Sequence, residues 1–553
     1  MSQEPGVYLV EDLRTRSMHG HDPKAEILFE RDVEAEMRDG ITLMTNVFRP
    51  TGPGKFPAII CMAPYGKDSM PPDQQFLRIK NVGVLPFSEL TGWETPDPAF
   101  WVPHGYAFIN IDCRGTNHSG GNRFDHMSEK MAEDFYDSVE WVAKQTWCDG
   151  NVGSNGVSYL AASQWLGATT NPPHLKAIMP WEGFNDWYRE HAFHGGIPDH
   201  GFFHEIWSRR MNAQTGFIAR DAEPERILEL QKEHPLHDAY WEGKRVKLEK
   251  INVPAYIAAG WATQGLHTRG SIEGFKRISS KEKWLEGHGR KEWETYYTRE
   301  ALERQRRFFD YFLKGEDSGI TELPRVRIEI RDQFYQGRVR CFDDWPVPGT
   351  DYRPLYLDPK LDALSESQVS VSDKVRYSAT ETETETDRTE FTYTFPVDTD
   401  LAGNMKLKLW VEAEGSDDLD IHVAIKKFDR RGKEVHFLDF QHCEVGMVAG
   451  GWLRASHRAL DPALSTPDRP WHTHVSEEKL KPGQIVPLEI EILPSATGFL
   501  AGEALVLIIQ GHDILKGFSR FNHSPSSINK GYHIIHCGDK YDSHLLIPVL
   551  PDC

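Results

Sequence analysis

Cysteine is scarce in this chain of 553 residues, which contains seven of them and no Cys-x-x-Cys spacing. An odd number of scattered cysteines argues against a disulfide framework and against a zinc site built from paired thiolates. Because unpaired thiols persist in reducing compartments, we expect a cytoplasmic protein.

Long apolar runs and an excess of basic charge are also lacking. No uncharged apolar run reaches about 18 residues, and the first twenty residues hold no apolar core of the signal-peptide type. We therefore expect no membrane association. The 63 Lys and Arg residues face 83 Asp and Glu residues, which gives a formal net charge of −20. Such a surface repels phosphate backbones, so nucleic acid is not an expected partner.

The first half of the chain does contain short continuous apolar runs, separated by stretches with helical periodicity. They lie at residues 56–62, 106–111, 175–179 and 253–258. Runs of this length, unlike alternating patterns, are typical of parallel strands that are buried on both faces. The pattern predicts an α/β sheet.

Two other regions break this rhythm. Residues 187–248 are rich in His, Trp and Phe and separate two predicted strands, which predicts a helical cap over the sheet. After residue 323, alternating strands with Gly and Pro turns predict an all-β sandwich. The predicted domains are thus 1–186 with 249–322, the cap at 187–248, and the β-sandwich at 323–553.

The sharpest motif for chemistry is the stretch from Gly153 to Leu160, which reads GSNGVSYL. A nucleophilic serine on a tight strand-to-helix turn needs small neighbours two residues away, and Gly156 stands at that spacing before Ser158. Leu160 occupies the matching position after the serine, where glycine is more usual. The motif predicts Ser158 as a nucleophile.

A serine nucleophile needs a base and donors for the oxyanion. His288 lies on a loop after a short apolar strand, where the base is expected. Tyr65 follows an early strand and can donate its hydroxyl to an oxyanion, with the backbone N–H of Tyr159 as second donor.

Several segments together resemble the cocaine esterase / X-Pro dipeptidyl-peptidase family of serine hydrolases, over nearly the whole chain. They read Arg38-Asp39-Gly40, Ala63-Pro64-Tyr65-Gly66-Lys67, Asp112-Cys113-Arg114-Gly115-Thr116, Ser119-Gly120-Gly121, Gly156-Val157-Ser158-Tyr159, Glu182-Gly183-Phe184-Asn185-Asp186-Trp187-Tyr188, Gly287-His288-Gly289 and Tyr541-Asp542-Ser543-His544-Leu545-Leu546-Ile547-Pro548.

The resemblance implies an α/β-hydrolase domain with an inserted helical cap, followed by an all-β jelly-roll domain. It also implies Ser158 as nucleophile, His288 as base and Tyr65 as oxyanion donor. In this family the apparatus cleaves esters or amides through an acyl-enzyme.

The chain departs from this family at the acid of the triad. The loop after residues 255–260 carries Thr263 where the family has an aspartate. Threonine can accept or donate a hydrogen bond but cannot stabilise an imidazolium by charge, and losing the acid costs about 10⁴ in rate. Glu182 and Asp186, which follow the strand before, are the candidates for a relocated acid.

Two alternatives to hydrolysis remain open from the sequence. One is a biosynthetic cyclase, isomerase or lyase that uses His288 and Tyr65 for proton transfer. The other is a catalytically weak binding protein. His200 and His204 have the spacing of metal ligands on a helix, but aromatic residues surround them and packing is the preferred interpretation. We expect no cofactor and no metal, a small-molecule substrate as partner, and we leave homo-oligomerisation open.

Overall fold

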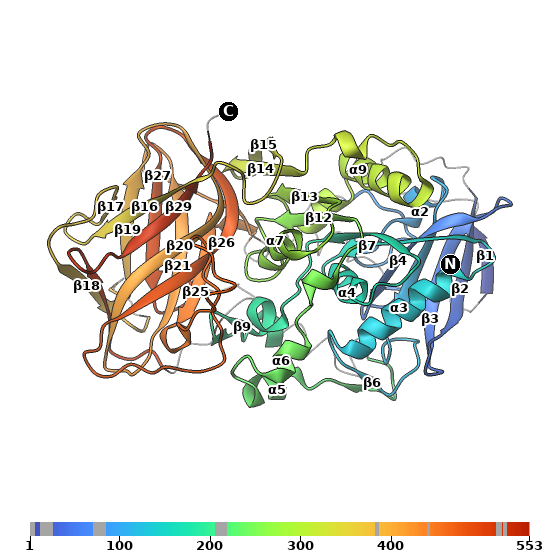
Figure 1. Ribbon diagram of the computed structural model, residues 1–553, viewed down its shortest axis with the longest axis horizontal. Helices are drawn as coiled ribbons and strands as arrows, with labels where there is room; N and C mark the ends of the chain where they lie inside the picture. Colours follow the sequence, from blue (N-terminus) through green and yellow to red (C-terminus); the bar gives the residue numbers. More distant parts are fainter. Residues whose placement is uncertain are drawn as a thin grey trace.

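The computed structural model describes residues 6–10, 26–69, 85–204, 218–381, 386–439, 443–515, 523 and 528–551. Figure 1 shows two bodies side by side, a sheet flanked by helices and a β-sandwich. Each has its own apolar core: one cluster surrounds the mixed sheet and a second lies between the strands of the sandwich. The predicted α/β domain followed by an all-β domain is confirmed.

The mixed sheet carries most of the residues that the sequence predicts for the site. In spatial order its strands are β1 (Gly6–Val10), β2 (Ile27–Glu36), β3 (Thr42–Pro50), β5 (Ala107–Asp112), β4 (Phe56–Ala63), β7 (Cys148–Val157), β8 (Leu175–Trp181), β12 (Ala255–Gly260), β13 (Lys283–His288), β14 (Val326–Gln333) and β15 (Gln336–Phe342). The strands from β5 to β14 are parallel, so their carboxyl ends meet at one edge. The four apolar runs are strands, as their pattern predicts.

Helices pack on the parallel part of this sheet. They are α2 (Pro98–Trp101), α3 (Glu129–Ala143), α4 (Tyr159–Ala168), α7 (Thr268–Arg277), α8 (Glu292–Tyr296) and α9 (Arg299–Phe309). Helix α3 begins at an N-cap, where the Ser128 side chain accepts a hydrogen bond from the Met131 N–H. Helix α9 begins in the same way, since Thr298 accepts from the N–H of Ala301.

The segment between β8 and β12 leaves the sheet and returns to it, because these two strands pair with each other. Its described part holds η1 (Tyr188–Ala192), β9 (Phe193–His194), β10 (Ile197–Pro198), β11 (Glu223–Pro224), α5 (Ile227–Glu233), α6 (Ala239–Gly243) and η3 (Leu248–Lys250). The insertion is therefore only partly helical. The boundary at 187–248 stays a prediction, as do those of the other domains.

The sandwich is built from β16 (Asp351–Asp358), β17 (Ala363–Ser365), β18 (Asp373–Ser378), β19 (Arg388–Thr394), β20 (Thr399–Glu414), β21 (Asp420–Phe428), β22 (Glu434–Val435), β23 (Phe437–Asp439), β24 (Cys443–Gly446), β25 (Ala449–Arg454), η6 (Ala455–His457), β26 (Val486–Phe499), β27 (Ala504–Gln510), β28 (Tyr532–Cys537) and β29 (His544–Val549). Within the described ranges, no helix is both long and apolar enough to cross a bilayer.

Buried polar contacts join the sandwich to the mixed sheet. Arg331, on β14, is 2% exposed and donates to the carbonyl oxygen of Val448 at 2.8 Å and to the Thr497 hydroxyl at 3.2 Å. Gln264 accepts from the backbone N–H of Gly450 at 2.8 Å. Separating the two bodies would break these hydrogen bonds and expose the surface that the interface buries.

We therefore predict that a fragment of residues 1–324 is insoluble or inactive when expressed alone. The cut removes β14 and the partners of Gln264, and it exposes apolar surface that the sandwich covers. The measurement is the soluble fraction and ester turnover of the fragment beside the full chain with the same tag. A soluble, fully active fragment contradicts the prediction.

Candidate active site

Ser158 lies on a strained turn at the carboxyl end of β7. Its backbone has φ 61° and ψ −116°, a conformation that costs a non-glycine residue energy and turns the side chain out of the sheet. Gly156 makes the turn possible, since a Cβ atom there would lie 2.6 Å from Cβ of Leu160. The larger residue at 160 therefore packs against the glycine two residues before the serine.

His267 is the histidine that contacts this serine. Its Nε2 lies 3.2 Å from Oγ of Ser158, and its Nδ1 lies 3.5 Å from Oε2 of Glu292. His267 immediately precedes α7 and is 1% exposed, while Glu292 begins α8. Burial lowers the pKa of His267 to about 4, so the ring is neutral near pH 7 and can accept a proton.

His288, at the end of β13, forms a different pair. Its Nε2 lies 3.0 Å from Oε1 of Glu182, and both side chains are buried. Burial by itself lowers the pKa of His288, but the Glu182 carboxylate more than offsets this, and the net pKa is raised. The Glu182 side chain thus favours the protonated form of the His288 imidazole.

Thr263 and Glu182 meet where the acid of the triad was expected. The Thr263 hydroxyl donates to Oε2 of Glu182 at 2.6 Å. Glu182 follows β8 with φ 51°, and its carboxylate lies on the backbone of Gly260, where any Cβ atom would overlap it. A carboxylate from the neighbouring strand thus reaches the Thr263 loop, and an aspartate at 263 would place a second negative charge against it.

The remaining predicted residues lie around this centre or apart from it. Tyr65 follows β4, and its ring packs edge-on against the ring of Tyr159, with centroids 6.1 Å apart. Both residues lie at the carboxyl ends of neighbouring strands, because β4 pairs with β7. Asp186 is bound elsewhere: its carboxylate pairs with Arg189 at 2.8 Å. The structure brings Glu182, and not Asp186, to His288.

Sequence analysis did not assign His267 or Glu292. The signal was present, since His267 follows Thr263 by four residues in the same loop, and Glu292 follows His288 by four. A third acid, Glu94, accepts from Nε1 of Trp293 at 2.9 Å and contributes to the charge around His267. Ligating atoms of Glu182, His267 and Glu292 lie within 4.8 Å of one another, close enough to hold a cation.

A strained serine beyond a parallel strand, in contact with a buried neutral histidine, is the arrangement of serine hydrolases with the α/β-hydrolase fold, and the chain is of this class. Residues 39–290 match the family model of the X-Pro dipeptidyl-peptidase (S15 family). Residues 318–546 match that of the X-Pro dipeptidyl-peptidase C-terminal non-catalytic domain.

Individual relatives agree with these matches. A CocE/NonD family hydrolase from Staphylococcus aureus is 44% identical, with a TM-score of 0.93, over 99% of this chain and 97% of that one. A cocaine esterase from Rhodococcus sp. is 27% identical over 59% of this chain and 62% of its own length, which is less than two thirds. A putative serine esterase from Mycobacterium bovis is 24% identical over 86% and 89%. The chain belongs to the CocE/NonD family of hydrolases.

The contact between Gly260 and Glu182 gives a test of the ion pair. We predict that Gly260→Ala destabilises the fold by about 1–3 kcal/mol, as overpacking of a buried site does, and lowers ester turnover. Gly243→Ala is the matched control, because nothing lies within 4 Å of the added Cβ there. The measurements are the free energy of chemical unfolding and the ester turnover of both variants. If the two variants are equally stable, the Glu182 carboxylate moves away from the added Cβ at no cost, and the prediction is wrong.

Proposed function

We propose that this chain hydrolyses esters of uncharged acyl groups through an acyl-enzyme on Ser158, with His267 as the general base. The observation that carries the proposal is the 3.2 Å contact between Oγ of Ser158, on the strand-to-helix turn after β7, and Nε2 of His267. The expectation that His288 is the base stays the alternative prediction, and the experiments below separate the two.

In the proposed reaction, Nε2 of His267 takes the proton from Oγ of Ser158 as Oγ attacks the substrate carbonyl carbon. The same Nε2–H then protonates the leaving alcohol. Water then attacks the acyl carbon and loses a proton to Nε2, and Nε2–H returns this proton to Oγ of Ser158 as the bond between Oγ and the acyl group breaks and the acid leaves. With Nε2 accepting the serine proton, Nδ1 carries a hydrogen that points toward Oε2 of Glu292, whose charge stabilises the imidazolium.

Tyr65 and the backbone N–H of Tyr159 are proposed as the oxyanion donors. Their positions at the carboxyl ends of β4 and β7 support this role, because an acyl group on Ser158 would place its oxygen at the same edge. The ring of Phe184 lies parallel to the His267 imidazole, with centroids 6.4 Å apart and an interplanar angle of 12°. An apolar neighbour of this kind supports an uncharged substrate.

We propose that the His288–Glu182 ion pair positions the base rather than serving as it. Glu182 holds Thr263 through a hydrogen bond, and the backbone N–H of His267 donates to the Thr263 carbonyl oxygen at 3.1 Å. The backbone N–H of Trp261 also donates to the His288 carbonyl oxygen at 2.7 Å. The pair therefore fixes both ends of the loop that carries His267.

The names of two relatives support an ester as substrate. These relatives are a cocaine esterase and a putative serine esterase. A cytoplasmic location is also proposed, supported by the cysteines at 61, 113, 148, 341 and 537, which are all free thiols.

The first experiment labels the protein with a fluorophosphonate and maps the modified peptide by mass spectrometry. We predict an adduct on Ser158 that Ser158→Ala abolishes. His267→Gln should reduce kcat/KM for an activated ester by about 10⁴-fold, as loss of a base does. His288→Gln should cost about 10²-fold, the effect of misplacing a catalytic group. If His288→Gln lowers kcat/KM more than His267→Gln does, the base is His288. If folded protein gives no adduct on Ser158, the hydrolysis proposal is contradicted.

The second experiment is the pH dependence of kcat/KM, which reports the pKa of the base in the free enzyme. A base must be unprotonated, so a lowered pKa extends activity to lower pH. If His267 is the base, the acid limb should fall with a midpoint of about 4. If His288 is the base, its raised pKa places the midpoint above the usual value of about 6.5. Tryptophan fluorescence across the same range checks that the protein stays folded.

A further inference from the structure

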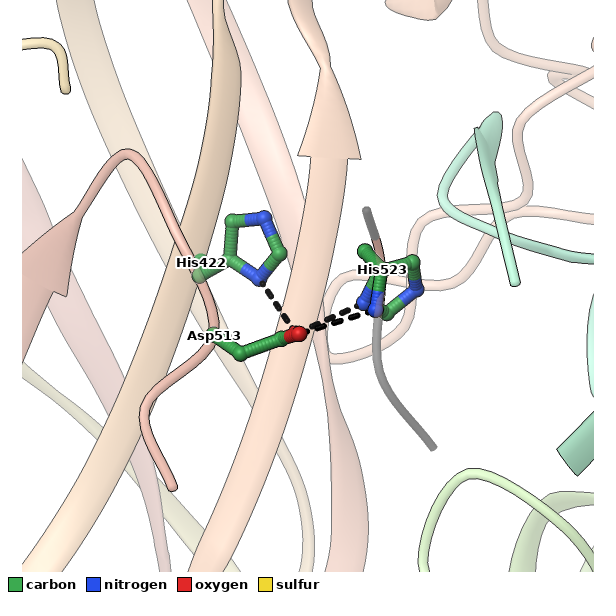
Figure 2. A group of neighbouring side chains, drawn as sticks. All are labelled: His422, Asp513 and His523. Carbon is green, nitrogen blue, oxygen red and sulfur yellow. Dashed lines mark hydrogen bonds and ion pairs between the residues drawn. The ribbon is translucent and has the colours of Figure 1, made fainter. Parts of the chain in front are cut away.

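Three ligand-type side chains meet at the face of β21 opposite the sandwich core, apart from Ser158 and His267. His422 lies on β21, Asp513 follows β27, and His523 comes from the next described position of the chain. Figure 2 shows the two imidazole rings on either side of the Asp513 carboxylate. Nδ1 of His523 lies 2.8 Å from Oδ1 of Asp513, and Nδ1 of His422 lies 3.4 Å from the same oxygen. All three ligating atoms lie within 4.8 Å of one another.

The neighbours of His523 determine where its proton lies. His194, on β9, has Nε2 at 2.8 Å from the carbonyl oxygen of Gly265, which can only accept, so this nitrogen carries the hydrogen. Nδ1 of neutral His194 is then an acceptor, and it lies 3.0 Å from Nε2 of His523, which must donate. Nδ1 is therefore the nitrogen of His523 that a metal ion could use, and in the metal-free protein it donates a hydrogen to Oδ1 of Asp513 at 2.8 Å. A metal ion bound here would replace that hydrogen, because a ligating imidazole nitrogen must be deprotonated.

His422 presents a second nitrogen to the same place. The residue is 2% exposed, and its Nδ1 makes no hydrogen bond among the described residues. Its 3.4 Å separation from Oδ1 of Asp513 is close to the edge of a tetrahedral site, about 3.3 Å for metal–ligand bonds of about 2.0–2.1 Å. The 2.8 Å between His523 and Asp513 is a hydrogen-bond length and must lengthen by about 0.5 Å when a metal ion replaces the hydrogen. A buried imidazole nitrogen without a hydrogen bond, aimed at a carboxylate, is the geometry that a bound metal ion satisfies.

We propose that His422, Asp513 and His523 bind a divalent transition-metal ion of the Zn²⁺ type through Nδ1, Oδ1 and Nδ1. Two imidazoles and one carboxylate are a donor set that Zn²⁺ accepts, and His194 fixes the tautomer of one ligand from outside. Water completes the coordination. It has room to enter, because a cavity beside the site is lined by Asp513, Trp452 and Gln264.

The site also connects the sandwich to the catalytic loop. His523 contacts His194 of the insertion, and His194 contacts the carbonyl oxygen of Gly265, two residues before His267. The ring of His194 is stacked on Trp452 of β25, with centroids 4.9 Å apart. A bound ion would hold His523 against this chain of contacts and thereby restrain the loop that carries the proposed base.

The test uses full-length protein, stripped with a chelator and titrated with Zn²⁺ under equilibrium dialysis. We expect one high-affinity ion per chain and a higher melting temperature when it is bound. His422→Ala and Asp513→Asn should weaken binding at least about 100-fold, and His194→Phe by about 10–100-fold, the range for a residue that orients a metal ligand. Circular dichroism of the metal-free variants shows whether they share the fold of the metal-free wild type.

Two controls separate this site from other sites. Glu292→Gln alters the other group of described residues that could hold a cation, and it should leave the Zn²⁺ affinity unchanged. The second control, His536→Ala, removes a histidine of the same domain that pairs with Glu412, and it should also leave the Zn²⁺ affinity unchanged. Co²⁺ added to metal-free wild type should give the strong visible absorption of a tetrahedral site, a readout that needs no variant. The proposal is overturned if wild type binds no Zn²⁺ tightly, if binding survives His422→Ala and Asp513→Asn, or if only Glu292→Gln removes it.

Discussion

The arrangement of the active site depends on one buried carboxylate, that of Glu182. It comes from the strand next to the nucleophile, lies on the bare backbone of Gly260, and bonds both His288 and the Thr263 hydroxyl. Leaving a charge in such a place without partners would cost several kcal/mol, so the surrounding loops are held to the positions that pair it. The loop from 260 to 267 is thereby fixed, and His267 with it.

The pKa values of the two histidines of the site shift in opposite directions for a physical reason. Oε2 of Glu292 lies 3.5 Å from His267, so burial dominates and lowers the pKa of His267 to about 4. His288 lies 3.0 Å from Glu182, and this carboxylate outweighs burial, so the pKa of His288 is raised. A neutral imidazole beside Ser158 can take a proton from the serine hydroxyl. Burial thus makes His267 suited to proton transfer, and the contact with Glu182 makes His288 suited to holding the loop in place.

The β-sandwich is joined to this site by hydrogen bonds and an ion pair. Gln264, within the catalytic loop, bonds the backbone of the sandwich, and Arg269 at the start of α7 pairs with Glu491 at 3.2 Å. His194 reaches from the insertion to the carbonyl oxygen of Gly265. A movement of the sandwich would therefore displace the loop that carries His267, because packed interiors transmit displacement.

Much of the architecture followed from local pattern. Continuous apolar runs became the parallel strands, and the residues around Ser158 became a strand-to-helix turn, because burial on both faces and the need for a small residue at 156 act over a few positions. The partner of the nucleophile did not follow. His267 and His288 have the same residue type and similar surroundings in sequence, and Asp186 was as good a candidate acid as Glu182.

The sequence by itself thus determined the fold class, the strand-to-helix turn at Ser158 and the absence of an aspartate at 263. Only the tertiary structure decided which histidine meets Ser158 and which carboxylate lies against Thr263. The reason is that these contacts join residues that follow β7, β8, β12 and β13 at one edge of the sheet. Which of these side chains meet depends on how the strands pair, and the pairing is not written in the local sequence. The meeting of His422, Asp513 and His523 is of the same kind, since three segments far apart in the chain converge there.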